Sequence, residues 1–212
     1  MKKKPRWPDY EVIMTSGDSI KVTRSLFQVG EGSAILTSPH QLEINHVGRG
    51  EAEYCYEKWH YLGKTGFMST YNFGVYFDGD LVGCISYGVP NAKEIDGMYK
   101  KYEQKGWWEI KRFALSPICP KNSESRMISV SIKILKKLAY VKGIVTYADS
   151  SVGHTGIIYK ASGFKYLGLT EQKTDLFIDG IKVGKKGQYR RAKEGEKEEW
   201  IKRSRKHLFV KK

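Results

Sequence analysis

The strongest constraint on the fold is a strand–helix–strand pattern near the middle of the chain. Trp107–Leu115 alternates between its two faces and predicts a strand. Apolar residues then recur at helical spacing, which predicts a long helix beginning at Asn122 or Ser123 and ending near residue 140. Ile144–Ala148 is a nearly unbroken apolar run, typical of a strand in a sheet that is covered on both faces. Such a crossover indicates an α/β domain.

Weaker patterns supply the flanking elements. Residues 1–45 carry short apolar alternations that indicate strands and turns, and the polar stretch Asp96–Gln104 is a helix candidate. The other expected elements are a helix at 49–60, a hairpin at 73–87 turned at Asp78-Gly79, a short helix at 154–161 followed by Gly163, a strand at 164–169 and a second hairpin at 175–183. The predicted fold is therefore α/β, with a mixed, mostly antiparallel sheet, a central strand–helix–strand crossover and flanking helices.

The positive charge of the chain is concentrated at its ends. The net charge is +14, of which residues 1–6 supply +4 and residues 185–212 supply +8. Basic ends around a nearly neutral middle favour a polyanion such as a nucleic acid as partner. The alternative is a tail that only keeps the protein in solution, and the mixed charges of residues 193–199 are compatible with a solvated helix. We expect three parts: N-terminal strands with a basic start at 1–45, a catalytic domain at 46–184 and a basic C-terminal extension at 185–212.

The remaining composition excludes several classes of protein. The chain has 212 residues and 40% hydrophobic residues, enough for one ordinary core with appendages. We find no apolar run long enough for a membrane span and no signal peptide. The three cysteines are scattered, which suits a reducing cytoplasmic setting better than a disulfide framework.

Two strand ends are candidates for the site, because ligands of open α/β sheets bind beyond the carboxyl ends of the strands. The first leads into the long helix, whose N-terminus lies between Lys121 and Arg126 and offers backbone amides to a pyrophosphate. The second is Asp149, which closes the buried strand. Ten residues later, Tyr159 to Phe164 has the pattern Tyr-x-x-x-Gly-Phe between a short helix and a strand.

This last pattern resembles the final core motif of the GNAT superfamily of acyl-CoA N-acyltransferases. In that superfamily the tyrosine often protonates the departing coenzyme A thiolate, because a proton donor makes the thiolate easier to expel. The chain departs from the superfamily in its phosphate loop. The usual glycine-containing loop is replaced by Pro120–Arg126, which has no glycine.

Several further blocks, in order, resemble the Mom family of phage DNA-modification proteins over about residues 50–170. They are Trp59-His60-Tyr61, Glu109–Pro117, Pro120–Ser125, Tyr147–Gly156 and Tyr159–Phe164. The resemblance implies a GNAT-like enzyme that adds an acetamido (carbamoylmethyl) or acyl-type group to N6 of adenine in DNA, and so protects phage DNA from restriction in the cytoplasm of the infected host. Double-stranded DNA with a flipped adenine would be the substrate.

The resemblance implies functional roles for His60, Arg112, Ser123 or Ser125, Asp149 and Tyr159, and the start of the long helix adds its own phosphate-binding candidates. The catalytic candidates are His60, Ser125, Asp149 and Tyr159, with Asp149 or His60 as the base and Tyr159 as the acid. The cofactor-binding candidates are Arg112, Lys121, Asn122, Ser123 and Arg126. Trp107 and Trp59 are expected to be exposed aromatic residues and are candidates for stacking on the base.

The donor is expected to be acetyl-CoA or a related CoA thioester. Plain acetyl transfer does not produce an acetamido group, so iron or another metal is also considered. His60, Cys55 and Cys119 show no diagnostic ligand spacing.

Each candidate has a structural alternative. His60 would only end a helix, and Arg112 would form a buried ion pair. Ser123, Ser125 and Asp149 would only cap helices, and Tyr159 would only fill the core. Two functional alternatives also stay open: an ordinary N-acetyltransferase acting on protein, RNA or a small amine, and a non-catalytic DNA-binding protein on a GNAT scaffold.

Overall fold

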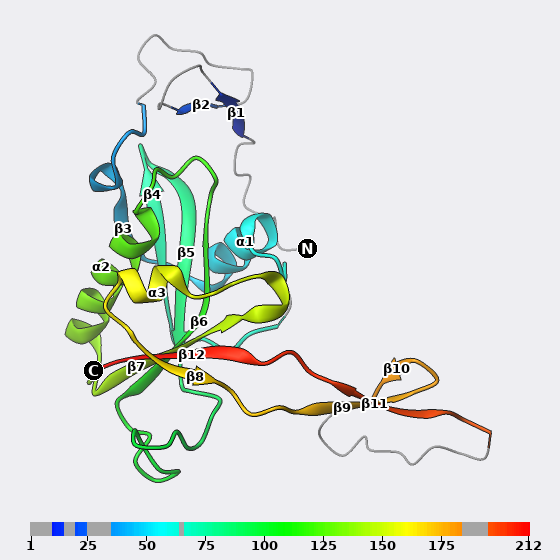
Figure 1. Cartoon of the computed structure of the whole chain (residues 1–212). Helices are drawn as coiled ribbons and strands as arrows, with labels where there is room; N and C mark the ends of the chain where they lie inside the picture. The colour runs from blue at the N-terminus through cyan, green and yellow to red at the C-terminus, as the bar shows by residue number, and fades with distance from the viewer. Residues whose placement is uncertain (1–9, 15–19, 25–34, 64–65, 184–194) are drawn as a thin grey trace, which may run out of the picture. The chain divides into compact units, whose positions relative to one another are not determined.

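The protein is an α/β structure with a mostly antiparallel sheet (Figure 1). The computed structural model describes residues 10–14, 20–24, 35–63, 66–183 and 195–212. The chain divides into two compact units, one of residues 1–144 with Lys212 and the other of residues 145–211. In the described part of the chain, no helix combines the length and apolar character needed to cross a membrane.

In the first unit, four neighbouring strands of one sheet lie in the order β3 (Glu43–His46), β4 (Tyr71–Phe77), β5 (Asp80–Gly88) and β6 (Trp107–Leu115). Each pairs antiparallel with its neighbour. The predicted turn between β4 and β5 is confirmed, because Asp78 and Gly79 both have positive φ values, 49° and 80°. A separate antiparallel pair, β1 (Tyr10–Met14) with β2 (Ile20–Arg24), confirms strands within residues 1–45.

The two α-helices in the described part of this unit were both predicted. α1 (Arg49–Trp59) packs its buried Ala52, Cys55 and Tyr56 against β5 and β6. α2 (Ser123–Leu138) buries one face through residues such as Met127, Ile128 and Leu135. Its N-cap is Asn122, in the left-handed region and without a side-chain hydrogen bond. The helix therefore begins through backbone geometry and not through the side-chain cap that we expected.

The helix expected at Asp96–Gln104 is not formed. Ile95 and Tyr99 instead make an isolated antiparallel bridge, and turns follow. The side chains of the segment satisfy its backbone, since Tyr99 Oη donates to Ala92 O and Gln104 Nε2 donates to both Pro90 O and Ala92 O. These side-chain bonds to the backbone compete with helical hydrogen bonds, which is why the polar pattern was misleading.

The second unit carries the remaining core elements. After β7 (Gly143–Asp149), whose first residues belong to the first unit, come α3 (Ile157–Ala161) and β8 (Lys165–Leu169). The chain order of hairpin, strand, helix, strand, helix and strand matches the sequence prediction. β12 (Lys206–Lys211) pairs antiparallel with β8, although these residues lie in the segment expected to be a basic extension. Phe209 and Val210 of β12 are almost completely buried.

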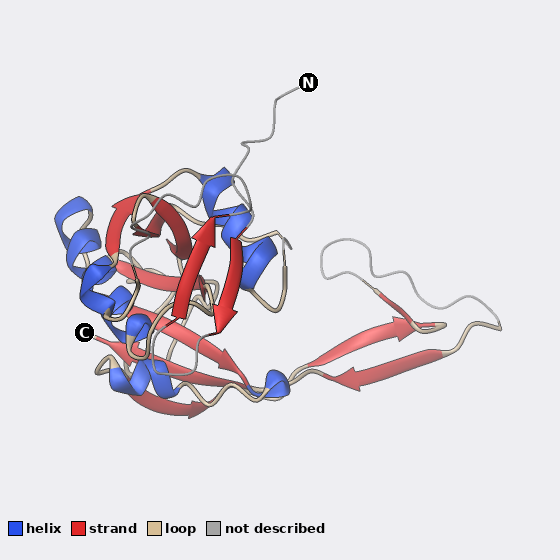
Figure 2. Cartoon of the chain, turned by 90° about the horizontal axis from the view of Figure 1, so that it is seen from above, coloured by secondary structure: helices blue, strands red, loops and turns tan. Residues whose placement is uncertain are grey.

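A three-stranded sheet extends the β8–β12 ribbon. It contains β10 (Ile181–Lys182), β9 (Thr174–Ile178) and β11 (Glu198–Lys202), in that order, and Figure 2 shows β9 and β11 continuing the line of β8 and β12. The predicted hairpin turn at Asp179-Gly180 is confirmed. The solvated helix expected within residues 193–199 is wrong for its last residues, because Glu198 and Glu199 belong to strand β11. Residues 193–194 and the basic residues 1–6 lie outside the described part of the chain.

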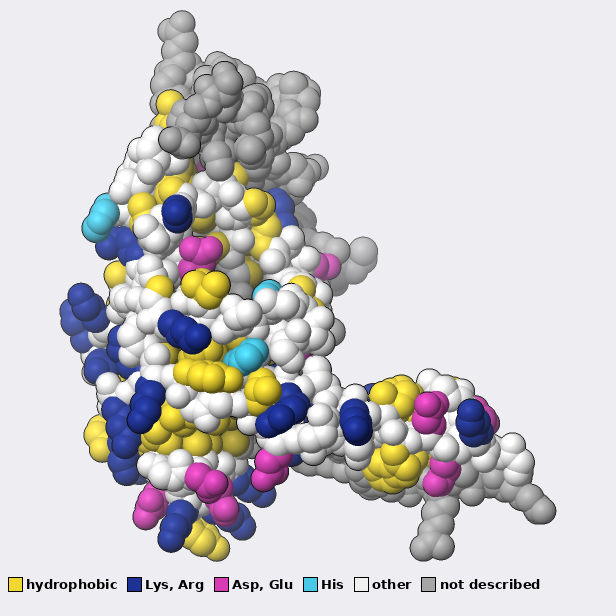
Figure 3. All heavy atoms as spheres, in the orientation of Figure 1, with side chains coloured by type: hydrophobic (Ala, Val, Ile, Leu, Met, Phe, Trp, Pro, Cys, Tyr) yellow, Lys and Arg dark blue, Asp and Glu magenta, His cyan; other side chains and the backbone are white. Residues whose placement is uncertain are grey.

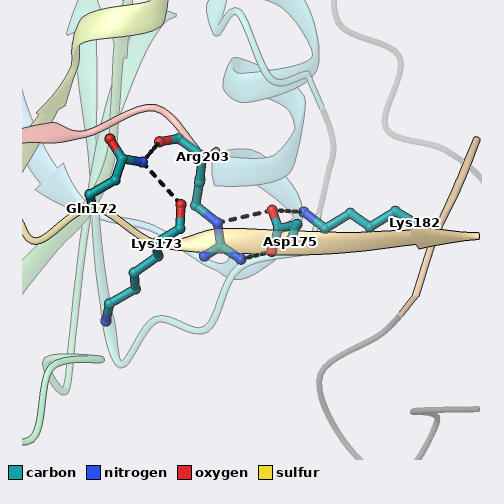
Figure 4. Close-up of polar contacts among 5 residues, drawn as sticks. All are labelled: Gln172, Lys173, Asp175, Lys182 and Arg203. Carbon is teal, nitrogen blue, oxygen red and sulfur yellow. Dashed lines mark hydrogen bonds and ion pairs between the residues drawn. The ribbon is translucent and has the colours of Figure 1, made fainter. Parts of the chain in front are cut away.

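A carboxylate holds the base of this three-stranded sheet together (Figure 4). Asp175 accepts hydrogen bonds from both Nε and Nη2 of Arg203 and from Lys182 Nζ, the last at 2.6 Å. Gln172 Nε2 donates to Arg203 O at 2.7 Å. The hydrogen bonds from Arg203 and Lys182 keep the pKa of Asp175 well below its usual range.

The variant Asp175→Asn should loosen this sheet. Amide hydrogen exchange in β9 and β11 should be faster than in the wild type at neutral pH. The wild-type carboxylate stabilises the fold above its unfolded pKa of about 3.9. Because its folded pKa is lower, this contribution disappears as the pH falls through the folded value, and the difference between the two proteins should shrink there. Glu171→Gln, which alters an exposed carboxylate, is the control; equal exchange in both variants would contradict the assignment.

Gly156→Ala should destabilise the second unit. Gly156 has a φ of 74°, and a methyl group there would lie 2.2 Å from the Phe209 ring. The left-handed backbone and the overpacked ring together cost about 2 to 5 kcal/mol. Chemical denaturation measures this loss, and Gly180→Ala, at a positive φ with open space around it, separates backbone strain from the ring clash.

Candidate functional site

Two of the predicted site residues share one aromatic cluster in the first unit. Arg112 is 7% exposed, and its Cζ lies 5.9 Å from the ring centroid of Tyr56 and 5.3 Å from that of Phe67. The His60 ring lies 5.8 Å from the same Tyr56 ring and stacks on Tyr61 at 4.6 Å. Tyr56 therefore lies between a histidine and an arginine that are 52 positions apart in the sequence.

Hydrogen bonds fix the geometry of this cluster. Tyr56 Oη donates to Arg112 O at 3.2 Å and lies 2.6 Å from Ser86 Oγ, which donates to Asn72 Oδ1. Arg112 Nη1 donates to Gly63 O at 3.0 Å. Burial lowers the pKa of Arg112, while the nearby Tyr56 and Tyr61 act in the opposite direction. The two aromatic faces and the Gly63 carbonyl compensate the guanidinium for part of its lost hydration.

The bond accepted by His60 defines its ring chemistry. Its Nδ1 accepts a hydrogen bond from Leu62 N at 3.1 Å. A neutral imidazole that accepts at Nδ1 carries its proton on Nε2. In this arrangement His60 presents a donor at Nε2, which suits positioning of a substrate acceptor better than removal of a proton.

The predicted phosphate cradle lies at the start of α2, also in the first unit. Ser123 is fully buried and its hydroxyl donates to Pro120 O, while the Ser125 hydroxyl donates to Asn122 O. Both hydroxyls thus stabilise the turn. Arg126 Nε is buried without a hydrogen-bond partner among the described residues. The first-turn amides, the exposed Lys121 and this arginine are the groups that suit an anion.

Asp149 lies at the carboxyl end of β7 in the second unit, as predicted. Its Oδ1 accepts from Ser151 N, Ser151 Oγ and Ser204 Oγ at 3.0, 2.7 and 3.1 Å, and its Oδ2 lies 3.8 Å from Lys206 Nζ. Partial burial acts to raise the pKa of Asp149, but the bonds from Ser151 and Ser204 and the charge of Lys206 outweigh it and leave the pKa below the usual value. The carboxylate is therefore ionised at neutral pH. Oδ1 also caps the short 3₁₀ turn Ser150–Val152, so this oxygen has the helix-capping role that was considered as the structural alternative for Asp149.

Tyr159 is nearly buried within an aromatic group of the same unit. Its ring lies 5.8 Å from Phe164 and 5.5 Å from Phe209. The contacts described for Tyr159 and for Asp149 involve different residues. The structure brings His60 together with Arg112 and brings Asp149 together with two residues of the C-terminal segment.

Sequence reasoning missed the partners of these residues. Ser204 and Lys206 come more than 50 positions after Asp149, and they lie near it because β12 is the neighbour of β7 in the sheet. Tyr56 carried a usable signal, because it lies four residues before His60 on one face of α1. Trp107 was wrongly expected to be exposed: it is 2% exposed and packs beside Tyr99 and over Gly143.

The described residues contain no group of three or more His, Cys, Asp or Glu side chains arranged to hold a metal ion. The iron considered from the sequence therefore gains no support in this part of the chain. Burial is the main reason why the thiols of Cys84 and Cys119 each have a pKa raised to about 12.

The model of the Mom protein family matches residues 41–211, which include all of the predicted site residues. The chain belongs to the Mom protein family.

A curated relative agrees with this membership. The chain is 28% identical over 152 residues to "Methylcarbamoylase mom" of Escherichia phage Mu. The match covers 71% of this chain and 63% of the phage Mu protein, so this Mom-family chain spans less than two thirds of its relative.

Solved structures give more distant likenesses. A GNAT family acetyltransferase from Elizabethkingia anophelis with acetyl-CoA bound is 15% identical, with a TM-score of 0.46, over 80% of this chain and 97% of that one. The aminoglycoside acetyltransferase AAC(6')-Ib with coenzyme A is 14% identical, with a TM-score of 0.45, over 61% and 87%.

Removing hydroxyls around Asp149 should raise its pKa. The double variant Ser151→Ala, Ser204→Ala removes two of the bonds to Oδ1 and should shift the pKa upward toward 3.8, the value of an unperturbed aspartate. A carbon-detected NMR titration of the carboxyl group measures the shift. Ser150→Ala is a matched control, because the Ser150 hydroxyl donates to Arg205 O and not to Asp149. An unchanged pKa in the double variant would show that these bonds do not control the carboxylate.

Proposed function

We propose that this chain transfers an acetamido (carbamoylmethyl) or related acyl-type group to N6 of adenine in DNA, and thereby protects phage DNA from restriction. The observation that carries the proposal is the match to the Mom protein family over residues 41–211, within which the candidate residues lie. The similarity to the phage Mu methylcarbamoylase supports a group-transfer reaction.

The lone pair of the exocyclic amine of adenine is delocalised into the ring, and the amine loses a proton as the new bond forms. The enzyme therefore needs a hydrogen-bond acceptor that orients the N–H group and can take its proton. Asp149 is ionised and offers Oδ2, whose one described contact is Lys206 at 3.8 Å. We assign Oδ2 to hold the N6–H group and to accept its proton late in bond formation. A low pKa makes a carboxylate a weak base, so orientation is the larger part of this role.

The other candidates receive positioning and acid roles. His60 would donate from Nε2 to an acceptor atom of the substrate, and Arg112, held by Tyr56 and Phe67, would fix a negatively charged or carbonyl group. Tyr159 would return a proton to the departing thiolate. Ser125 would act by keeping the start of α2 in shape, since its hydroxyl bonds to Asn122 O.

A CoA thioester is the donor class that the residues fit. Lys121, the first-turn amides of α2 and the unpartnered Nε of Arg126 would hold its phosphates, with Asn122 and Ser123 shaping the turn. When bound, the thioester would supply an activated carbonyl carbon and a thiolate leaving group, which accounts for an acyl-type product; a carbamoylmethyl product is joined through its CH2 carbon and would need a further co-substrate. The chain's own residues would orient the amine and exclude water.

Double-stranded DNA with the adenine flipped out of the stack is the proposed substrate form, because a paired and stacked amine is inaccessible. The cytoplasm of the infected host is the corresponding location.

Mass spectrometry of nucleosides tests the proposal. DNA from cells that express the chain should contain deoxyadenosine with an added group, and expression of Asp149→Ala or Tyr159→Phe should reduce this product at least about 100-fold, as for the loss of an acid–base group. Unmodified deoxyadenosine alongside soluble, folded wild-type protein would contradict it. Acetyl-CoA turnover on an amine without DNA would instead support an ordinary N-acetyltransferase. Protection of DNA by both variants would support a non-catalytic binder.

A further inference from the structure

The C-terminal half of α2 and the segment after it carry only positive charge. Between Ser125 and Ala148 the sequence contains five cationic residues and no acidic one. Four of them are exposed lysines: Lys133, Lys136, Lys137 and Lys142. The first three are spaced i, i+3 and i+4, so they lie on one face of the helix.

The end of the β5–β6 loop is fixed against the segment that follows α2. Lys142 N donates to Gly106 O at 2.7 Å, and Trp108 Nε1 donates to Tyr140 O at 3.0 Å. A methyl group on Gly106 would lie 2.6 Å from Tyr140 Cε1. These contacts place the exposed Lys105 near Lys142, in the segment that follows the helix. We name the surface made by Lys105, Lys133, Lys136, Lys137, Tyr140 and Lys142 the lysine–tyrosine patch.

The charge of this patch has no described internal partner. Among the residues that the structure describes, none of its five lysines forms an ion pair, and Glu103 is the one acidic residue of the adjoining segment 100–106. Tyr140 is 68% exposed in the middle of the lysines. The helix dipole favours lysines in the last turn of α2, but that effect does not account for Lys105 or Lys142.

We propose that the lysine–tyrosine patch binds the sugar–phosphate backbone of duplex DNA. The inference rests on the proposed function, which makes DNA the substrate, and it adds a contact surface within the folded body. Lysines act as compact charges that neutralise phosphates without reading bases, and a tyrosine hydroxyl donates to phosphate oxygens.

The patch is separate from the start of α2. A helix of 16 residues is about 24 Å long, so the phosphate cradle and the patch lie at opposite ends of it. Figure 3 shows Lys and Arg side chains gathered along the flank where Figure 1 draws the end of α2.

The salt dependence of DNA binding tests the inference. Fluorescence anisotropy with a labelled duplex should give a weaker affinity for Lys136→Gln, Lys137→Gln, Lys142→Gln, and the slope of log K against log salt should become shallower by about 2 to 3. The matched control changes three exposed lysines elsewhere: Lys93→Gln, Lys165→Gln, Lys173→Gln. An equal loss of slope in both variants would overturn the patch as a DNA contact.

Two further measurements separate this inference from the proposed function. Duplex DNA should protect Lys136 and Lys137 of the wild-type protein from chemical acetylation, and unprotected lysines would overturn the inference without any variant. In the modification assay the patch variant should raise KM for DNA about tenfold and leave kcat unchanged. A patch that binds DNA in a chain without modification activity would support the inference and refute the function. If the patch variant modifies DNA with the wild-type KM, the proposed function is supported and the inference about the patch is refuted.

Discussion

The burial of the Arg112 guanidinium is the constraint on which the first unit depends. A charge in the core is costly unless its surroundings replace water, and here two aromatic faces and the Gly63 carbonyl do so. Tyr56 serves twice, because its ring covers the guanidinium and its hydroxyl donates to the backbone carbonyl of the same arginine. Since Tyr56 comes from α1 and Arg112 from β6, this pair fixes the helix on the sheet and carries His60 into the cluster.

The second unit solves a different problem, which is to hold an ionised carboxylate at the end of a buried strand. Ser151 lies two residues after Asp149 in the chain, but Ser204 and Lys206 are brought to it by the segment that enters β12, the neighbour of β7 in the sheet. Burial of Phe209 against Gly156 anchors that ribbon beside α3. The C-terminal segment therefore supplies core packing and electrostatic support, in addition to the positive charge that was apparent from its composition.

Local patterns predicted the elements whose period or turn chemistry is strong. β6, α2, β7 and the turns at Asp78-Gly79 and Asp179-Gly180 were found where the sequence placed them. Prediction failed at the irregular segment 96–104, where the side chains of Tyr99 and Gln104 donate hydrogen bonds to backbone carbonyls. It also failed at β11, a polar strand whose residues are all exposed and therefore show no apolar alternation. Trp107 looked like a stacking residue because periodicity does not reveal that both faces of β6 are covered. The partners of Asp149 were beyond sequence reasoning, because a long-range ladder creates the contact.

The central claim is that the chain modifies the exocyclic nitrogen of adenine, with Asp149 holding that amine. The most direct measurement uses duplex DNA whose adenine N6 is labelled with ¹⁵N, incubated with the purified protein and a CoA thioester and then digested for tandem mass spectrometry. The account predicts that the added group is found on the fragment that retains the ¹⁵N label, and that this product is lost with Asp149→Ala. An added group on any other nucleobase or on the protein itself, with the labelled nitrogen unmodified, would contradict it.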